Sequence, residues 1–490
     1  MKKTTVGALL AALLVLPGCR KAVPAGAASV RMPRGDAVWL EDPAAAGEPG
    51  LEDALQRIAA VALFLPAGEV AFEAGRWKLQ EVQDPPHPMT RIPVVLVLRA
   101  GPELSGSLMS AEGADEASVG KSIASALKPS MAADGPFGKV IGVLLNFPFA
   151  PAGSSRYAAL VTALRGALPT GTFVAIALRN MPASEAERKK IEPLLAAADA
   201  TMAFVFRDGE RLDATAVDAL RRPWWAAFGT AGHGTRTGAD GTARGNLEEK
   251  FLDPLTGNPR VELQNDLSSN DATLSAFNLL ASQPVHVNGL TLERGDRIAF
   301  RLPAETEMLF QLGSTLNGKH LALGRVMVFE GTSDAERLFP LAAFEDVLLG
   351  RTLAPSVEVT VHPVGRAVSV EAVNDAAHAS IVSRLSNWVE VDLAPARPAD
   401  VQLGGFDRYE VYDSNGRAVS PGRASRVRLF ETIIAPREAI PPARILVRGA
   451  LPKNCCRTRF HVISAAGPEV AMDWTEPPVP KVPEKAKRTK

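Results

Sequence analysis

Short apolar runs alternate with amphipathic stretches from residue 36 to about residue 350. The runs are rich in leucine and β-branched residues, as strands buried on both faces are. We expect strands at 36–42, 62–70, 92–101, 140–146, 172–180, 200–208, 223–230, 296–303 and 324–331. This alternation is typical of α/β architecture, and it predicts a (β/α)8-like barrel over residues 36–352. A closed barrel takes eight strands, so one of these segments is accessory or the barrel is distorted.

The stretches between the runs carry apolar residues at helical spacing. In the first of them, Leu51, Leu55 and Ile58 fall on one helical face. Ser184 and Glu187 match the S-x-x-E capping box at the start of a later helix. We expect helices at 51–62, 115–131, 154–168, 184–198, 271–283 and 333–350.

The segment after the seventh expected strand is rich in glycine. Six glycines lie between residues 229 and 245, which argues for a mobile loop rather than a packed element. Such a loop can act as an active-site lid, and a surface insertion without a role is an equal alternative. Just before it, Trp224 and Trp225 could stack on sugar rings. Adjacent residues of a strand point to opposite faces, so at least one of them is expected in the core.

From about residue 355 the pattern changes to a strict alternation of apolar and polar positions. Alternating segments at 356–375, 388–394, 408–413 and 425–435 are separated by Gly, Pro and Asn turns. This pattern predicts an antiparallel β-sandwich over residues 353–475. The last stretch, 476–490, combines Pro and Lys without an apolar face, so we expect a disordered tail there.

The N-terminus reads as a targeting segment. It consists of MKK, the apolar run VGALLAALLVLP, and then Gly18 and Cys19. A charged start, a short apolar core and a small residue before the cleavage point mark a secretory signal. We interpret residues 1–18 as a bacterial lipoprotein signal peptide, Cys19 as the lipid-bearing residue and 19–35 as a tether. An ordinary secretory signal with a chance cysteine is the alternative.

This interpretation predicts a lipid-anchored protein of the bacterial cell envelope, with the membrane as a partner. The apolar run falls short of the ~20 residues that a transmembrane span needs. Arg20, rather than an aspartate, follows Cys19, which favours the outer membrane under enteric-style sorting.

Charge and cysteine content bear on the partners of the protein and on its disulfide bonds. Removing Lys2 and Lys3 with the signal leaves 52 basic and 54 acidic residues. Nucleic-acid binding needs concentrated positive charge, so we predict no nucleic-acid partner. Besides Cys19 the chain has only the neighbours Cys455 and Cys456. Adjacent Cα atoms lie about 3.8 Å apart, below the usual ~4.4 to 6.8 Å of a disulfide, so a bond between them is expected to be strained.

Three blocks of sequence carry a resemblance to a known family. They are LPAGEV at 65–70, VVLVLRAG at 94–101, and LLNF followed by RYAALVTALRGALPTGTFVAIALRNMP within 144–182. With the lipoprotein start, they resemble an uncharacterised family of bacterial lipoproteins with a glycoside-hydrolase-like, TIM-type barrel. The resemblance covers residues 36 to 350. It implies a location in the cell envelope and a shared fold more than a particular reaction. Members usually end the fourth strand in an acidic DFD-like sequence, whereas this chain has LNFPF, which puts catalysis in doubt.

Functional groups of such a barrel sit at the carboxyl ends of its strands. The candidate catalytic carboxylates at those places are Glu41, Glu69 and Glu330, and the candidate binding residues are Arg99, Asn146, Arg179 and Asn180. Glycoside hydrolysis needs two carboxyl groups, about 5 to 5.5 Å apart for retention or roughly 6.5 to 9.5 Å apart for inversion. Each carboxylate can instead be a loop-end charge or the ion-pair partner of an arginine such as Arg99.

Other chemistry finds less support. The seven histidines form no H-E-x-x-H and no close pair, and the chain has no G-x-S-x-G elbow, so we predict no metal and no cofactor. We expect, first, a membrane-anchored lipoprotein whose degenerate barrel binds carbohydrate or serves as a scaffold. The alternatives are an active glycoside hydrolase that uses the strand-end carboxylates, and a structural envelope protein without a ligand.

Overall fold

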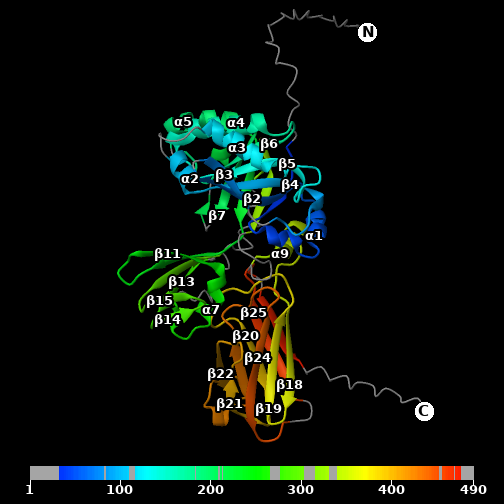
Figure 1. Ribbon diagram of the computed structural model, residues 1–490. Coiled ribbons are helices and arrows are strands. Elements are labelled where there is room, and N and C mark those ends of the chain that lie inside the picture. The colour runs from blue at the N-terminus through cyan, green and yellow to red at the C-terminus, as the bar shows by residue number, and fades with distance from the viewer. Residues whose placement is uncertain are drawn as a thin grey trace, which may run out of the picture.

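The computed structural model describes residues 32–475, except 75, 82–83, 110–115, 183, 208–209, 212, 265–275, 303–314, 330–338, 452–454 and 468. The interpreted signal peptide, Cys19, Glu330 and the tail 476–490 lie outside the described residues. Three bodies follow one another along the molecule: a barrel, a small β-rich insertion and a sandwich (Figure 1).

Eight parallel strands close the barrel. They are β1 (Ala37–Leu40), β2 (Leu63–Glu73), β4 (Met89–Ala100), β5 (Gly138–Asn146), β6 (Phe173–Leu178), β7 (Ala200–Arg207), β9 (Trp224–Gly229) and β17 (Ala322–Phe329). The ring closes because β1 pairs with both β2 and β17. The predicted barrel is confirmed, and the expected strand at 296–303 is the accessory one.

Helices and short hairpin strands complete the barrel. The helices are α1 (Leu51–Arg57), α2 (Pro102–Met109), α3 (Glu116–Leu127), α4 (Ser154–Ala167), α5 (Glu185–Ala197), α6 (Ala214–Asp218) and α9 (Leu341–Leu349). The hairpin strands are β3 (Arg76–Glu81), which pairs with β2, and β8 (Glu210–Arg211), which pairs with β7. The predicted cap is present, since Ser184 Oγ accepts a hydrogen bond from the Glu187 amide at 3.2 Å.

Between β9 and β17 the chain forms the insertion, built on an antiparallel sheet. Its elements are β10 (His233–Thr237), β11 (Ala243–Glu248), α7 (Leu252–Thr256), β12 (Val261–Leu263), β13 (Ala276–Ala281), the hairpin of β14 (Val285–Val287) with β15 (Leu290–Leu292), and β16 (Arg297–Arg301).

Two sequence predictions are wrong in the insertion. The glycine-rich segment is a hairpin rather than a loop, because β10 and β11 pair and Gly241, at a φ of +81°, supplies the turn conformation that L residues rarely adopt. The expected helix at 271–283 is a strand in its described part. There Phe277, Leu279 and Ala281 are buried at alternate positions of β13, which is the period of a strand packed on one face.

The C-terminal region is an antiparallel sandwich, as predicted. One sheet has the order β18-β19-β24-β21 and the other β22-β23-β20-β25-β26. The strands are β18 (Val357–Val364), β19 (Ala367–Asn374), β20 (Trp388–Asp392), β21 (Arg397–Gln402), β22 (Arg408–Tyr412), β23 (Arg426–Phe430), β24 (Ala439–Arg448), β25 (Arg457–Ile463) and β26 (Glu469–Thr475).

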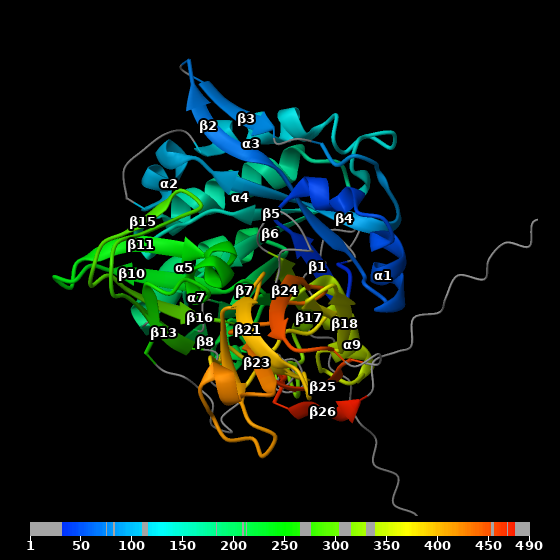
Figure 2. The same cartoon turned by 90° about the horizontal axis from the view of Figure 1, so that it is seen from below.

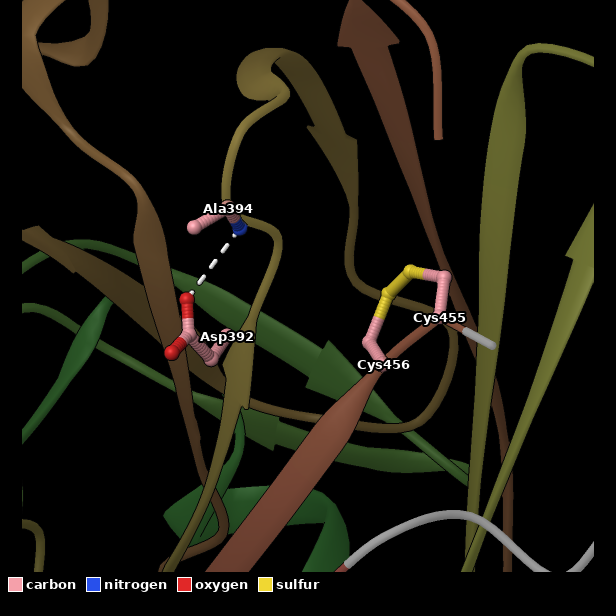
Figure 3. The surroundings of a disulfide bond; sticks show 4 residues. All are labelled: Asp392, Ala394, Cys455 and Cys456. Carbon is pink, nitrogen blue, oxygen red and sulfur yellow. Dashed lines mark hydrogen bonds between the residues drawn. A yellow bond between two sulfur atoms is a disulfide. The ribbon is translucent and has the colours of Figure 1, made fainter. Parts of the chain in front are cut away.

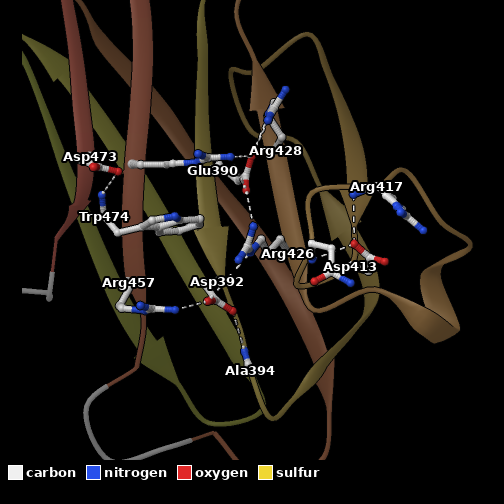
Figure 4. A network of polar contacts seen from close by, with 12 residues as sticks. Glu390, Asp392, Ala394, Asp413, Arg417, Arg426, Arg428, Arg457, Asp473 and Trp474 are labelled. Atoms are coloured by element: carbon white, nitrogen blue, oxygen red, sulfur yellow. Dashed lines mark hydrogen bonds and ion pairs between the residues drawn. The ribbon is translucent and has the colours of Figure 1, made fainter.

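The outer face of the five-stranded sheet carries an ordered network of charges (Figure 4). Fully buried Glu390 lies in register between Arg428 and Arg459. Its Oε2 accepts hydrogen bonds from Nη2 of Arg428 at 2.6 Å and of Arg459 at 3.1 Å. The Arg428 guanidinium also lies 4.1 Å from the ring centroid of Trp388, so stacking and ion pairing hold the same side chain.

A disulfide joins the neighbours Cys455 and Cys456 just before β25, across a cis peptide bond with the Cα atoms 3.0 Å apart (Figure 3). Both cysteines are buried against the sandwich core. A bond between adjacent residues closes no chain loop, so it adds none of the loop-closure stabilisation of a longer-range disulfide.

The sandwich contacts both other bodies. Nε2 of His378 in the sandwich lies 3.0 Å from Oδ2 of Asp346 in α9. Val382 and Ile433, also from the sandwich, belong to the apolar core of the insertion. Seen from below, the sandwich lies in front of the barrel with the insertion at its side (Figure 2).

Candidate functional site

Aromatic side chains fill the interior of the barrel. Alternation along each strand turns one set of residues outward, under the helices, and the other set inward. The inward set includes Trp39, Phe64, Phe173, Phe204 and Trp225, all of them buried. The Trp225 ring centroid lies 5.9 Å from that of Phe64 and 5.6 Å from that of Phe173. The interior is therefore a packed core, and a ligand has to bind at the rim.

Trp224 and Trp225 are both fully buried, on opposite sides of β9. Trp224 packs in the outer core, where its Nε1 donates a hydrogen bond to Asp218 Oδ1 at 3.1 Å. The predicted alternation is confirmed, and neither indole is available to stack on a sugar.

Polar side chains end several strands on the inward side of the barrel. Leu40, Leu98, Leu145 and Leu178 face the outer core, so the next residue on each strand faces inward. These next residues are Glu41, Arg99, Asn146 and Arg179. Glu69 shares this side, because it is in register with Arg99 on the adjacent strand. The structure thus brings five of the sequence-predicted residues to one rim.

The first pair at this rim is ionic. Arg99 Nη2 lies 3.2 Å from Glu41 Oε1, and the two side chains are 45% and 22% exposed. In the sheet, β2 stands between the strands that carry them, so the ion pair crosses the inward side of β2. The Glu69 carboxylate packs against Gly101, where an added Cβ would lie 3.0 Å from Oε1. Glu41 is therefore the partner of an arginine, as the alternative interpretation of the strand-end carboxylates predicts.

The second pair joins an amide to a guanidinium. Asn146 is buried, and its Oδ1 accepts hydrogen bonds from Arg179 Nε at 3.3 Å and Nη2 at 3.2 Å. The guanidinium needs an acceptor at this place, and an amide oxygen supplies it without a negative charge. At the ends of the fourth and fifth barrel strands the rim consequently carries no described carboxylate.

Tyr157 on α4 holds the segment after Asn146 in place. Its hydroxyl donates a hydrogen bond to the Leu145 carbonyl at 3.1 Å. Its ring stacks on Phe147 at 5.7 Å and meets the edge of Phe149 at 5.4 Å. Complete burial raises the pKa of Tyr157 well above its ordinary value, so this side chain remains a neutral donor.

A pocket of about 340 Å³ opens beside these two strand ends. Phe149, Met181 and Met109 supply an apolar wall, while Arg179 and Asn180 supply hydrogen-bonding groups. Its size falls within the range of small-molecule sites, which start at roughly 300 Å³. We call this cavity the rim pocket.

The structure groups the predicted residues in two sets. Asn146, Arg179 and Asn180 gather at or behind the rim pocket, whereas Arg99, in register with Asn146 on the neighbouring strand, forms an ion pair with Glu41. Glu330 lies outside the described residues. The sequence reasoning missed the apolar wall of the pocket, although the runs NFPF and NMP, which place apolar residues directly after strand ends, are the signal that could have found it.

Two further features bear on chemistry. Within the described ranges, no group of three or more His, Cys, Asp or Glu side chains is arranged to hold a metal ion. The helices in the described part of the chain include none that is long and apolar enough to cross a membrane.

No protein-family model and no curated protein matches the sequence. Among solved structures, the chain is similar to the Bacillus cereus spore cortex-lytic enzyme SleL, at 11% identity and a TM-score of 0.39, over 65% of this chain and 75% of that one. It is also similar to a group IV chitinase of Ostrinia furnacalis, at 11% identity and a TM-score of 0.40, over 64% of this chain and all of that one. A xylanase and α-amylase inhibitor protein matches at 12% identity and a TM-score of 0.36, over 65% and 98%. The structural neighbours are thus glycoside-hydrolase-type barrel proteins, at scores from which no argument about the activity of this chain follows.

Proposed function

We propose that the barrel binds a glycan at the rim pocket and does not hydrolyse it. One observation carries the proposal: polar groups at four strand ends are tied to each other, Glu41 to Arg99 and Asn146 to Arg179. A hydrolytic site instead presents two carboxyl groups to the bond that is cleaved.

The lining of the rim pocket suits a sugar ring. The ring offers an apolar face to an aromatic side chain such as Phe149, and its hydroxyl groups pair with donors and acceptors such as Arg179 and Asn180. The hydrogen bonds from Arg179 to Asn146 fix the guanidinium before a ligand arrives, which lowers the entropic cost of binding.

Binding is tested with the mature chain and a panel of peptidoglycan, chitin, xylan and alginate. We expect at least one of them to bind, and Arg179→Ala to weaken that binding about tenfold, because a charge-assisted hydrogen bond is lost. Arg188→Ala is the matched control, since this substitution removes the same charge from an exposed position of α5 outside the pocket. Binding to none of the panel, or an equal loss in both variants, would contradict the proposal and favour a structural protein.

A working glycoside hydrolase is the second candidate. Glu41 directly follows β1, and Glu69 lies on the adjacent strand β2, both on the inward side of the barrel. The adjacency of β1 and β2 favours Glu41 and Glu69 as a carboxyl pair. Turnover by the natural protein that Glu69→Gln or Glu330→Gln abolishes would establish this function.

We also propose that lipid on Cys19 holds the protein at the bacterial outer membrane. The support is the sequence around the cysteine, and several acyl chains give firm anchoring where one chain is marginal. Radiolabelled palmitate is expected to label the expressed full chain. Cys19→Ala is expected to lose both the label and membrane fractionation. Label that survives this substitution would refute the anchor.

A further inference from the structure

A cluster of carboxyl groups lies where the insertion meets the sandwich. Three members come from the sandwich: Asp407 before β22, Glu431 after β23 and Glu438 before β24. Asp253 of α7 contributes the fourth from the insertion, at the exposed edge of the cluster. We call these four residues the junction carboxyls.

Contacts between the two bodies place these groups at a packed interface. Asp407 Oδ1 would lie 2.6 Å from a Cβ added to Gly257, the residue that ends α7. Two apolar side chains of the sandwich, Val382 and Ile433, are buried in the core of the insertion. The Arg384 guanidinium donates a hydrogen bond to the Val261 carbonyl across the same interface. The two bodies therefore meet closely around the cluster.

Glu431 is the most buried member. It is 4% exposed, and its Oε2 has no hydrogen-bond partner among the described residues. The neighbouring carboxyls have hydrogen-bond donors. Asp407 Oδ2 accepts a hydrogen bond from the Thr432 amide at 2.8 Å, and Glu438 Oε2 accepts one from the Ala435 amide at 2.7 Å. An ionised Glu431 carboxylate is costly in this buried place beside Asp407, whereas a protonated carboxyl is tolerated.

The charges around the cluster do not neutralise it. Basic side chains on the elements that pack here have other contacts: Arg408 pairs with Glu410, Lys250 pairs with Glu248, and Arg437 is exposed. Burial, followed by the charges of Asp407, Glu438 and Asp253, raises the pKa of Glu431 to about 11. Burial chiefly raises the pKa of Glu438 to about 7.

We propose that Glu431 and Glu438 make the junction a pH-responsive contact, which holds the insertion on the sandwich while these two carboxyls are protonated and loosens it as they ionise. The insertion starts just after β9, at the strand ends that carry the rim. Loosening its contact with the sandwich therefore changes the surface beside the barrel mouth. This inference is independent of the proposed glycan binding.

The direction with pH follows from linkage. Glu431 and Glu438 bind protons more tightly in the closed junction than in the open one, where these two glutamates have their ordinary pKa of 4.5. Opening therefore releases protons and becomes more favourable as pH rises from 4.5, with Glu438 contributing up to about 7 and Glu431 beyond it. Each proton released changes the opening equilibrium up to about tenfold per pH unit.

Hydrogen–deuterium exchange of the full chain between pH 5 and pH 8 tests the proposal, after correction for the intrinsic exchange rate. We expect protection of α7 and of residues 430–438 to fall at least about tenfold across this range. Strands β5 and β6 of the barrel, which carry none of the junction residues, serve as internal references and are expected to change little.

Glu431→Gln keeps the shape of the protonated side chain and cannot ionise, so it is expected to remove most of the pH dependence. Glu358→Gln, on an exposed position of β18, is the matched control and is expected to behave as the natural chain. Glu438→Gln is the second variant, should Glu431→Gln not fold, and it is expected to weaken the response below pH 7, where Glu431 alone then contributes. The proposal would be overturned by protection that does not change with pH, or by a pH response that persists in both glutamine variants. A loss of protection spread evenly over the chain would also overturn it.

Discussion

Trp225→Ala is expected to lower the free energy of unfolding of the barrel by about 4 kcal/mol, the cost of removing a large aromatic side chain from a core that collapses only in part. The indole is fully buried and contacts Phe64 and Phe173 at the centre of the barrel interior. Aromatic neighbours on several strands hold the cavity open, so little of the loss is recovered by repacking.

Urea unfolding followed by far-UV circular dichroism measures the effect without relying on tryptophan fluorescence. Phe72→Ala is the control, because this aromatic side chain is 44% exposed on the hairpin of β2 and β3 and is expected to cost less than about 1 kcal/mol. A loss below about 1.5 kcal/mol for Trp225→Ala would show that the interior is not packed around this ring.

Glu390→Ala is expected to destabilise the sandwich by about 3 kcal/mol, because removal of one partner of a buried ion pair leaves the other charges uncompensated. Glu390 is fully buried, and Arg428 and Arg459 both donate hydrogen bonds to it (Figure 4). After the substitution, the two guanidinium groups repel each other across the same strand.

Glu410→Ala provides the comparison on the same face of the sheet. Its side chain is 40% exposed and pairs with Arg408, so the expected loss is below about 1 kcal/mol. Equal losses in the two variants, measured by urea unfolding at pH 7, would show that burial does not set the strength of this network.

The barrel was predictable because its strands are nearly uninterrupted apolar runs. VVLVL in β4 and FVAIAL in β6 are buried on both faces, and their short length and β-branched content favour a strand over a buried helix. The sandwich was predictable for the opposite reason, since β20 alternates outward Glu390 with inward Val389 and Val391.

The insertion was harder because its local signals conflict with its tertiary structure. Leu274, Phe277 and Leu280 have the spacing of a helical face, yet pairing with β12 and β16 makes β13 a strand. The glycines after β9 suggested a loop, although a hairpin needs glycine only at its turn, as at Gly241. In both places tertiary pairing overrides local propensity.

The rim shows what a linear sequence cannot supply. The apolar runs of the sequence end just before Glu41, Arg99, Asn146 and Arg179, so the position of these residues at strand ends follows from the sequence. That Arg99 reaches across β2 to Glu41, and that Asn146 faces Arg179, depends on the order and stagger of the strands in the closed barrel. The partners of the strand-end charges, and with them the case against hydrolysis, therefore required the structure.

The most direct test of the account measures binding and cleavage on one sample. The mature chain is incubated with each polysaccharide that it retains, and the solution is assayed for new reducing ends over a day, alongside Glu69→Gln and Arg179→Ala. The account predicts retention that depends on Arg179, with no more reducing ends than a blank without protein. New reducing ends that form with the natural chain and disappear with Glu69→Gln would contradict it and identify an active glycoside hydrolase.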